Sequence, residues 1–357
     1  MKMHMYRLVS TAVLLLAGVI FASTAHADGV YGDFAVDWYY MAGHHMDGDV
    51  TGEGDTLAID GYNAFQLRRI RMGFKRSLAP NLAMDFRLEA GMPDFLSNIQ
   101  GNSAVATPFV KDAHMTWSLS DDVNLRFGLQ GNLINENPES FWGYRSVEKT
   151  ILDLQKIEPS RDLGISLNAT LDDFSLRILA GNGNGDKSES YEGKEIFATA
   201  GYRIMPGLLA EAGICFEAEN DEDQTHTTLL GLLGYQSPAF HGGVQYAMYK
   251  QAYGDDTEDL DINLLSVFGA VPVSPKMEVL ARYDMSDANP AADGIQYFRM
   301  ADYAPTNTII AGVAYTPVPN FQLIPNVEYV SYGDPEEEGV ETPDADTIVR
   351  LTIWNKW

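Results

Sequence analysis

The feature that most constrains this chain is a repeated alternation of apolar and polar residues with a period of two. From Val30 onward, runs of about ten residues show this alternation, and turn residues end each run. In the run from Leu82 to Ala90 every second residue is apolar, and Asp85, Arg87 and Glu89 lie between the apolar ones. A period of two predicts β-strands with one apolar face, and the chain contains sixteen such runs.

The connections between these runs alternate strictly between short and long. Short connections lie near residues 77–81, 120–122, 172–173, 205–207, 237–239, 272–275 and 317–320. Long connections lie near residues 44–62, 92–108, 131–162, 182–194, 218–226, 252–259, 286–304 and 333–344. Tight turns at one end and long loops at the other are typical of outer-membrane barrels. The sequence therefore predicts an all-β fold, a transmembrane antiparallel β-barrel of about sixteen strands with both termini on the short-turn side.

A soluble β-sandwich or a propeller is the alternative fold for an alternating chain of this length. Neither needs an apolar outer face on nearly every strand, nor so regular an asymmetry of loop lengths. A closed barrel needs both, because it must satisfy every backbone polar group while its outer face contacts lipid. The pattern therefore favours the membrane barrel.

The first residues are typical of a secretory signal peptide. Lys2 and Arg7 precede an apolar run, Leu8 to Ala22, and the small-residue tripeptide Ala25 to Ala27 follows. We expect cleavage after residue 27, so that residues 1–27 are a signal peptide and residues 28–357 form the barrel. The apolar run is shorter than the roughly 20 residues that a spanning helix needs, which makes a retained anchor the less favoured interpretation.

The last run ends with an aromatic residue, since Val349, Leu351, Ile353 and Trp357 share one face. An amphipathic final strand of this kind resembles the signal that the outer-membrane assembly machinery reads. We therefore expect export to the outer membrane of a Gram-negative cell. The expected partners are the assembly machinery, the lipid bilayer and lipopolysaccharide.

Composition excludes several other classes of protein. The formal charge of −26 argues against a nucleic-acid partner, because binding phosphates needs clustered Lys and Arg. No apolar stretch after Ala27 approaches eighteen residues, which excludes an α-helical membrane protein. Cys215 is the only cysteine, so we interpret it as a small apolar residue and expect no disulfide and no cysteine-based zinc site.

His44 and His45 are adjacent and would point apart on a strand, which argues against a metal-binding pair. No Ser, His and acid set has recognisable spacing, and we expect no enzyme activity, cofactor or metal.

The same alternation predicts which charged side chains face the barrel interior. The inward arginines are Arg69, Arg71, Arg87, Arg126, Arg177, Arg203, Arg282 and Arg350. The inward acidic residues are Asp33, Asp37, Asp85, Glu89, Asp112, Glu211, Glu217, Asp261, Glu278, Asp284 and Glu328. Guanidinium groups match phosphate and carboxylate oxygens, but the acidic set makes the predicted wall mixed in charge. Arg68 is out of phase with its neighbours and is expected to reach lipopolysaccharide phosphates outside the barrel.

The longest connection, Gly131 to Asp162, is too apolar for a free surface loop, since it includes Phe141, Trp142 and Tyr144. We expect it to fold inward and narrow the pore. The constriction candidates in it are Arg145, Glu148, Lys149, Lys156 and Arg161. The alternative is that this connection packs between subunits.

Five segments of the chain resemble a known family. The segments Phe65 to Lys75 and Asn81 to Glu89, together with Val147 to Lys149, Arg161 to Ile165 and Gly181 to Gly185, are similar to the phosphate-selective porin O and P family. The resemblance covers the N-terminal half of the mature chain. It implies a sixteen-stranded homotrimeric channel whose third loop folds into the lumen. The chain departs from the family after Gly128, where it reads Leu-Gln-Gly-Asn-Leu and family members often carry a lysine and a Pro-Phe pair.

The strand count carries the functional expectation, because a barrel of about 16 strands encloses an aqueous channel whereas one of about 8 fills its own interior. We expect a porin for passive diffusion of ions and small hydrophilic solutes. Two alternatives stay open: an anion-selective or phosphate-selective porin that uses the lumen arginines, and a structural or adhesive barrel with a closed lumen.

Overall fold

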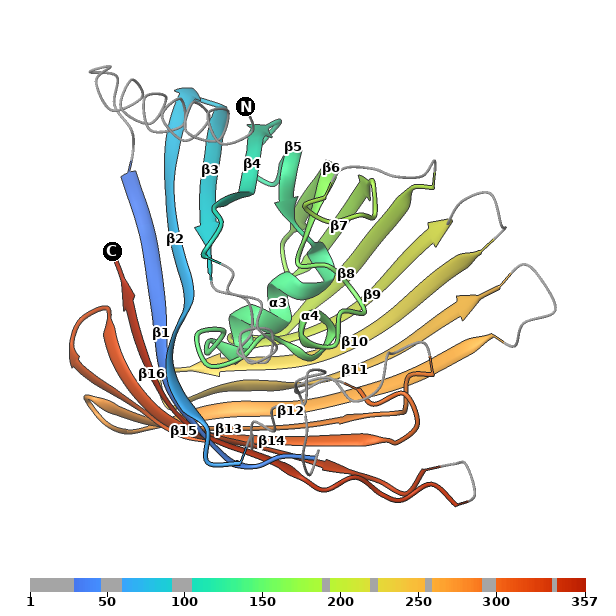
Figure 1. Ribbon diagram of the computed structural model, residues 1–357. Helices are drawn as coiled ribbons and strands as arrows, with labels where there is room; N and C mark the ends of the chain where they lie inside the picture. Colours follow the sequence, from blue (N-terminus) through green and yellow to red (C-terminus); the bar gives the residue numbers. More distant parts are fainter. Residues whose placement is uncertain are drawn as a thin grey trace, which may run out of the picture.

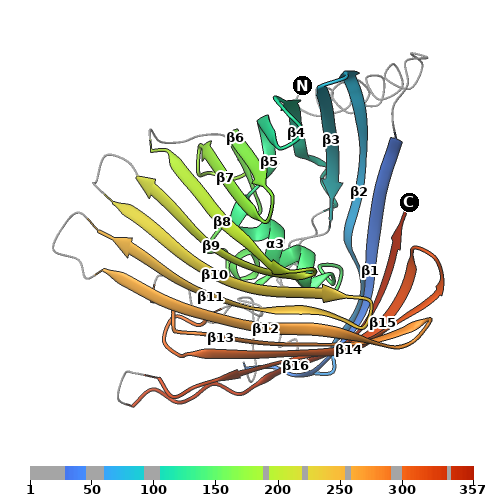
Figure 2. The same cartoon turned by 180° about the vertical axis from the view of Figure 1, so that it is seen from behind.

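The computed structural model of the protein describes residues 29–45, 60–91, 105–187, 193–218, 224–253, 259–290, 300–335 and 339–357. Within these residues sixteen antiparallel strands form one closed barrel in which each strand pairs with its sequence neighbours and β1 pairs with β16 (Figures 1 and 2). The strands are β1 Gly29–Gly43, β2 Asn63–Ala79, β3 Leu82–Ala90, β4 Phe109–Ser118, β5 Val123–Gly131, β6 Arg161–Leu171, β7 Phe174–Gly181 and β8 Glu195–Met205. The second half comprises β9 Leu208–Ala218, β10 Thr225–Ser237, β11 Phe240–Ala252, β12 Leu260–Ser274, β13 Met277–Ser286, β14 Thr306–Val318, β15 Phe321–Tyr332 and β16 Asp346–Lys356.

The strand number and the order of short and long connections confirm the prediction from sequence. Two-residue turns rely on residues that tolerate a left-handed backbone, as at Asp172 (φ 53°) and Asn320 (φ 66°). The expected signal peptide lies outside the described residues. No helix in the described part of the chain is long and apolar enough to cross a membrane.

Closure of the barrel joins the two ends of the chain. The register runs from Asp33 opposite Lys356 to Met41 opposite Ile348. Beyond it, the Gly32 amide donates to the Trp357 carbonyl at 3.1 Å, and the Trp357 amide donates to the Gly32 carbonyl at 3.0 Å. Closure leaves no unpaired sheet edge, which is what a sheet surrounded by lipid requires.

The strand faces follow the predicted alternation over most of the barrel. On β13, for example, Val279, Tyr283 and Met285 are exposed, whereas Arg282 and Asp284 between them are buried. The exposed apolar residues form the outer face of the barrel, and the buried polar residues face its interior. This arrangement is the reverse of a soluble barrel and is the one expected of a barrel whose outer face contacts lipid.

Three charged residues break the simple alternation. The register shifts by one residue beside Arg68 on β2 and beside Lys111 on β4, so both are the extra residues of β-bulges. Both side chains turn inward, and the predicted contact of Arg68 with lipopolysaccharide is therefore wrong. Asp261 on β12 was predicted to face inward, but its side chain is 67% exposed and lies on the outer face near Lys250.

Most of the buried apolar core lies between the connection after β5 and the inner faces of β7 to β15, and a separate cluster joins β1, β15 and β16 around Met41 and Ile348. This connection contains α3, Leu133–Trp142, and α4, Ile151–Leu154. Inward residues such as Phe197, Leu232, Ile262 and Phe268 form apolar clusters with it. The inner positions of β12 are therefore as apolar as its outer positions, which explains why alternation misplaced Asp261. Figure 1 shows α3 and α4 surrounded by the strands.

Candidate pore constriction

The segment from residue 132 to residue 160, called the constriction segment below, has a defined local structure. Asn132 caps α3, because its side-chain oxygen accepts a hydrogen bond from the Ile134 amide at 3.0 Å. The Asn132 side-chain amide also donates to the Pro159 carbonyl at 2.9 Å, which joins the two ends of the segment. Gly143 ends α3 with a left-handed backbone (φ 72°), the conformation that glycine adopts most readily.

Apolar side chains hold α3 against one side of the barrel. The helix packs on β7 to β12. Trp142 is fully buried, and its ring meets the Phe268 ring edge to face with centroids 6.0 Å apart. The Trp142 indole N–H donates to the Glu148 carbonyl at 2.9 Å, which folds the chain after α3 back onto the helix. His241 on β11 contacts the Phe141 carbonyl at 2.9 Å and satisfies an acceptor at the helix end.

Two arginines from the other side of the barrel hold the tip of the segment. Arg68 on β2 contacts the carbonyls of Ser146 and Val147 and pairs with Glu148 at 2.9 Å. Arg350 on β16 donates to the same Val147 carbonyl at 3.2 Å. Both arginines also lie within 3.4 Å of a carboxylate oxygen of Asp37 on β1. Glu148 and Asp37 are buried, so they need these guanidinium groups to be stable as charges.

Arg282 on β13 makes a third tether. Its guanidinium donates to the Lys149 carbonyl and to Asp284, and it lies over the Trp142 ring, 5.6 Å from the ring centroid. Asp284 in turn accepts a hydrogen bond from the Ser266 hydroxyl at 2.5 Å. Arg282 therefore works as a structural support of the segment.

The base of α3 rests on a second polar network. Arg177 on β7 pairs with Glu136 at 2.9 Å and with Glu211 at 2.8 Å, and it donates to the Leu133 carbonyl at 3.1 Å. Arg126 on β5 pairs with the other oxygen of Glu136 at 3.3 Å. The Glu136 side chain is 34% exposed, so this network reaches solvent within the barrel.

Charged residues inside the segment also pair with one another. Arg145 pairs with Glu139 at 2.6 Å and with Asp153, and Lys149 lies 3.5 Å from Asp153. Burial opposes the charge of Asp153, but Arg145 and Lys149 hold its pKa at about 2. Burial likewise opposes the charge of Glu148, and Arg68 and Arg350 hold its pKa at about 2. Both carboxylates are therefore ionised at neutral pH.

The remaining predicted pore residues occupy distinct surroundings. Arg71 pairs with Asp33 at 2.6 Å, and Arg87 and Arg161 share Asp112. Arg69 is buried among Arg71, Arg145 and Glu89. Two residues lie away from this network: Arg203 is 56% exposed beside Asp173 at the short-turn end, and Lys156 is exposed after α4.

Alternation missed two functional candidates, Arg68 and Lys111. The Lys111 ammonium lies 3.2 Å from the Ser160 hydroxyl and 3.6 Å from Asp186. Each basic residue directly precedes a residue that was correctly predicted to face inward. A bulge adds one residue without changing the composition of a strand. Its only signal in the sequence is a charged residue at a position that alternation assigns to the apolar outer face.

The sequence interpretation of His44 and His45 also needs correction. β1 ends at Gly43, so the two rings are not held on opposite faces; they stack with centroids 4.1 Å apart. His45 contacts Asp346 at 2.9 Å, and the three side chains could hold a metal ion.

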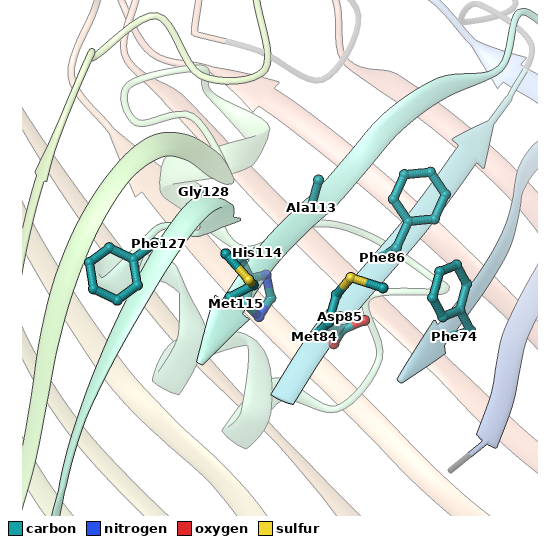
Figure 3. A pocket seen from close by; sticks show the side chains of 9 residues that line it. All are labelled: Phe74, Met84, Asp85, Phe86, Ala113, His114, Met115, Phe127 and Gly128. Atoms are coloured by element: carbon teal, nitrogen blue, oxygen red, sulfur yellow. The ribbon is translucent and has the colours of Figure 1, made fainter. Parts of the chain in front are cut away.

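A separate hollow lies on the outer face of β2 to β5 (Figure 3). Its apolar lining comes from outward positions on these four strands: Phe74, Met84, Phe86, Ala113, Met115 and Phe127. The hollow exists because the small Ala113 side chain lies between the larger side chains of this lining and does not fill the space. Because it opens outward, this hollow is not part of the constriction.

No protein-family model and no curated protein matches the chain. Solved structures do match its fold. The chain is similar to an anion-selective porin from Comamonas acidovorans, with a TM-score of 0.65 and 14% identity over 92% of this chain and 99% of that one. It is similar to the outer-membrane channel DcaP of Acinetobacter baumannii, with a TM-score of 0.62 and 14% identity over 92% and 96% of the two chains.

A third similar structure is the trimer form of OmpT, an outer-membrane protein of Vibrio cholerae. Its TM-score is 0.62, with 14% identity over 92% of this chain and 98% of that one. The protein thus has the closed-barrel fold of outer-membrane porins and channels. These neighbours support a porin-type barrel and do not single out the phosphate-selective porin O and P family.

Proposed function

We propose that the protein is an outer-membrane porin through which ions and small hydrophilic solutes diffuse passively. The observation that carries this proposal is the position of the constriction segment. It packs on the inner faces of β7 to β12 through apolar residues, and arginines of β2, β13 and β16 hold its tip. A sixteen-stranded barrel is wide enough to keep an aqueous path beside such a segment.

The proposed path runs between the constriction segment and the inner faces of β2 to β6. This wall carries many basic side chains, including Arg71, Arg87 and Arg126, whereas the inner faces of β8 to β12 are mostly apolar and carry the buried carboxylates Glu195, Glu211 and Glu217. The most exposed charges that face it from the segment are Lys149, at 39%, and Glu136, at 34%. Opposite charges across a narrow path create a transverse field that orients water and polar solutes.

The mechanism is selection by size and charge without chemical turnover, so we propose no enzyme activity and no cofactor. Most arginines on the path are paired with a carboxylate. A paired charge attracts a passing anion less than a free one, because the fields of its two members largely cancel beyond the pair. We therefore propose weak selectivity, with the acidic long loops favouring cation entry.

An anion-selective channel is the second candidate, and one observation favours it. Glu89 on β3 lies among four cationic groups, those of Arg69, Arg71, Lys111 and Arg145. Arg71, Lys111 and Arg145 also pair with other carboxylates, so Arg69 is the cation of this group that is left to attract an anion next to the path. Membership of the phosphate-selective porin O and P family would fit this candidate. That membership rests on the resemblance of residues 65–75, 81–89, 147–149, 161–165 and 181–185.

We also propose that the chain forms a homotrimer in the outer membrane, where it contacts the lipid bilayer and lipopolysaccharide. The apolar hollow on β2 to β5 supports a subunit contact on that wall. Strands β3 to β5 have 9 or 10 residues, whereas β10 to β12 have 13 to 15. A neighbouring subunit would cover this shorter wall. Recognition of the last strand by the outer-membrane assembly machinery belongs to the same proposal.

The test is single-channel recording of the refolded protein in planar bilayers. A potassium chloride gradient gives the ion preference from the reversal potential, and added phosphate tests for block. An open channel with a neutral or cation-favouring reversal potential supports the leading proposal. Chloride preference with block by phosphate supports the second candidate. Absence of conductance in every salt would reject both and favour a structural or adhesive barrel.

A further inference from the structure

Four side chains that could bind a metal meet where the constriction segment ends. They are Glu158 in the connection after α4, Glu195 on β8, Cys215 on β9 and His226 on β10. The three strand residues lie on the inner face of neighbouring strands. One ligand atom from each of the four residues can be chosen so that all lie within 4.8 Å of one another.

The geometry leaves several buried acceptors without a donor. Glu158 and Glu195 are fully buried, and neither oxygen of Glu158 has a hydrogen-bond partner. The second oxygen of Glu195 is also without a partner, while its first oxygen accepts a hydrogen bond from the Cys215 thiol. Buried carboxylate oxygens without a donor are costly, because they have lost their hydration and gained nothing in return. A bound cation would satisfy them.

His226 is oriented for metal binding by a neighbouring carboxylate. Its Nδ1 lies 3.2 Å from Glu217, which assigns the ring proton to Nδ1. The lone pair of Nε2 then points toward the cluster, 3.6 Å from Glu195 and 4.0 Å from the Cys215 sulfur. A carboxylate that fixes the tautomer of a ligating histidine is a common feature of zinc sites.

We propose that Glu158, Glu195, Cys215 and His226 form a zinc site that fastens the end of the constriction segment to β8, β9 and β10. One sulfur, one imidazole nitrogen and two carboxylate oxygens are a four-ligand set that Zn²⁺ accepts in tetrahedral geometry. Ligand atoms of such a site are about 3.4 Å apart, close to the separations from Nε2. Thiolate and imidazole ligands disfavour Mg²⁺ and Ca²⁺, which prefer oxygen.

This inference corrects two interpretations made from the sequence. Cys215 is not merely a small apolar residue, because its thiol contacts Glu195 and His226. A single cysteine also does not exclude a zinc site that contains cysteine, since histidine and carboxylates from other strands complete the set. His226 is 13% exposed near the long-loop end of β10 and gives the ion a route of entry. The site does not depend on the proposed channel activity.

The test uses the full chain, purified without a polyhistidine tag, refolded in detergent after treatment with a chelator, and then incubated with Zn²⁺ and freed of the excess. We expect one tightly bound Zn²⁺ per chain by elemental analysis. Replacing zinc with Co²⁺ should produce a thiolate-to-cobalt charge-transfer band in the near ultraviolet. Because the chain has one cysteine, this band can come only from Cys215.

Variants locate the ion. Cys215→Ser should abolish the cobalt band and weaken zinc binding by more than about 100-fold, since loss of an outer partner alone typically costs about 10- to 100-fold. Glu158→Gln should weaken binding and remove the rise in thermal stability that zinc gives the wild-type barrel. His114→Gln, a histidine on β4 outside the cluster, is the matched control and should bind as the wild type does.

Three results would overturn the inference. One is wild-type protein that binds no zinc and gives no cobalt band, which would indicate that Glu158 and Glu195 share a proton instead. The second is equal zinc binding in Cys215→Ser, which would place the ion elsewhere, for example at His44, His45 and Asp346. The third is zinc binding that depends on Cys215 but not on Glu158, which would leave the segment unfastened.

Discussion

The two halves of the inner wall hold the constriction segment in different ways. The wall from β8 to β15 supplies most of the apolar side chains that contact the segment, with Arg282 of β13 as a polar tether, and Trp142 and its neighbours are buried against it. The wall from β16 through β1 to β7 presents charged side chains, and Arg68, Arg350 and Arg177 bind the segment by ion pairs and carbonyl contacts. Apolar burial thus sets the depth at which the segment lies, and directed polar contacts set the position of its tip.

The largest effect should come from removing the main apolar anchor. Trp142→Ala removes a fully buried indole, and a change of this kind in a packed core costs about 3–5 kcal/mol. The segment should detach from the β8 to β15 wall, and single-channel recordings should show a larger and noisier conductance. Trp117→Ala, on the exposed outer face of β4, is the matched control. Unchanged conductance in Trp142→Ala would mean that apolar burial against β8 to β15 does not hold the segment in place.

A smaller effect should come from the charged wall. Arg68→Ala leaves Asp37 and Glu148 with only the guanidinium of Arg350, and breaking a buried ion pair costs about 3 kcal/mol. We expect channel noise from a loose tip, with no change in mean depth of the segment. Arg76→Ala, at a partly exposed position near the other end of the same strand, should be silent. Equal recordings from the two variants would show that the bulge at Arg68 has no role.

Acid should loosen the charged contacts while it leaves the apolar anchor intact. The pKa values of Glu148 and Asp153 are about 2 in the folded protein, below their ordinary values of 4.5 and 3.8. Their contribution to stability is complete above the ordinary values and is lost as the pH falls toward 2. Channel noise should therefore rise between about pH 4 and pH 2. A flat response over that range would contradict the assignment of these ion pairs.

The smallest effect concerns ion preference. Arg69→Gln removes one of the four cations around Glu89, and the permeability ratio of chloride to potassium should fall on the order of twofold at low salt. Arg203→Gln removes the same charge from an exposed position at the short-turn end, where water and salt screen it. The reversal potential should hardly change there. An equal shift in both variants would mean that the charged wall does not control selectivity.

The sequence predicted most of the fold because the barrel places one simple demand on it. Lipid outside and water inside require opposite character on alternate residues, so period two and the order of short and long connections gave the strands directly. The same pattern indicated the inward direction of Arg71, Arg87, Arg282 and Arg350. It could not indicate their partners, because ion pairs join residues on different strands and on the constriction segment.

The sequence by itself determined the number of strands, the faces of most of them and the unusual apolarity of residues 131–162. Only the tertiary structure decided where alternation fails. Bulges turned Arg68 and Lys111 inward. On β12 the inner face against α3 is apolar as well, so alternation could not tell that Asp261 faces outward. The tertiary structure also brought Glu158, Glu195, Cys215 and His226 together from four separate positions in the sequence. The physical reason is that alternation is a local demand of the solvent on each strand, whereas bulges and clusters depend on which strands become neighbours.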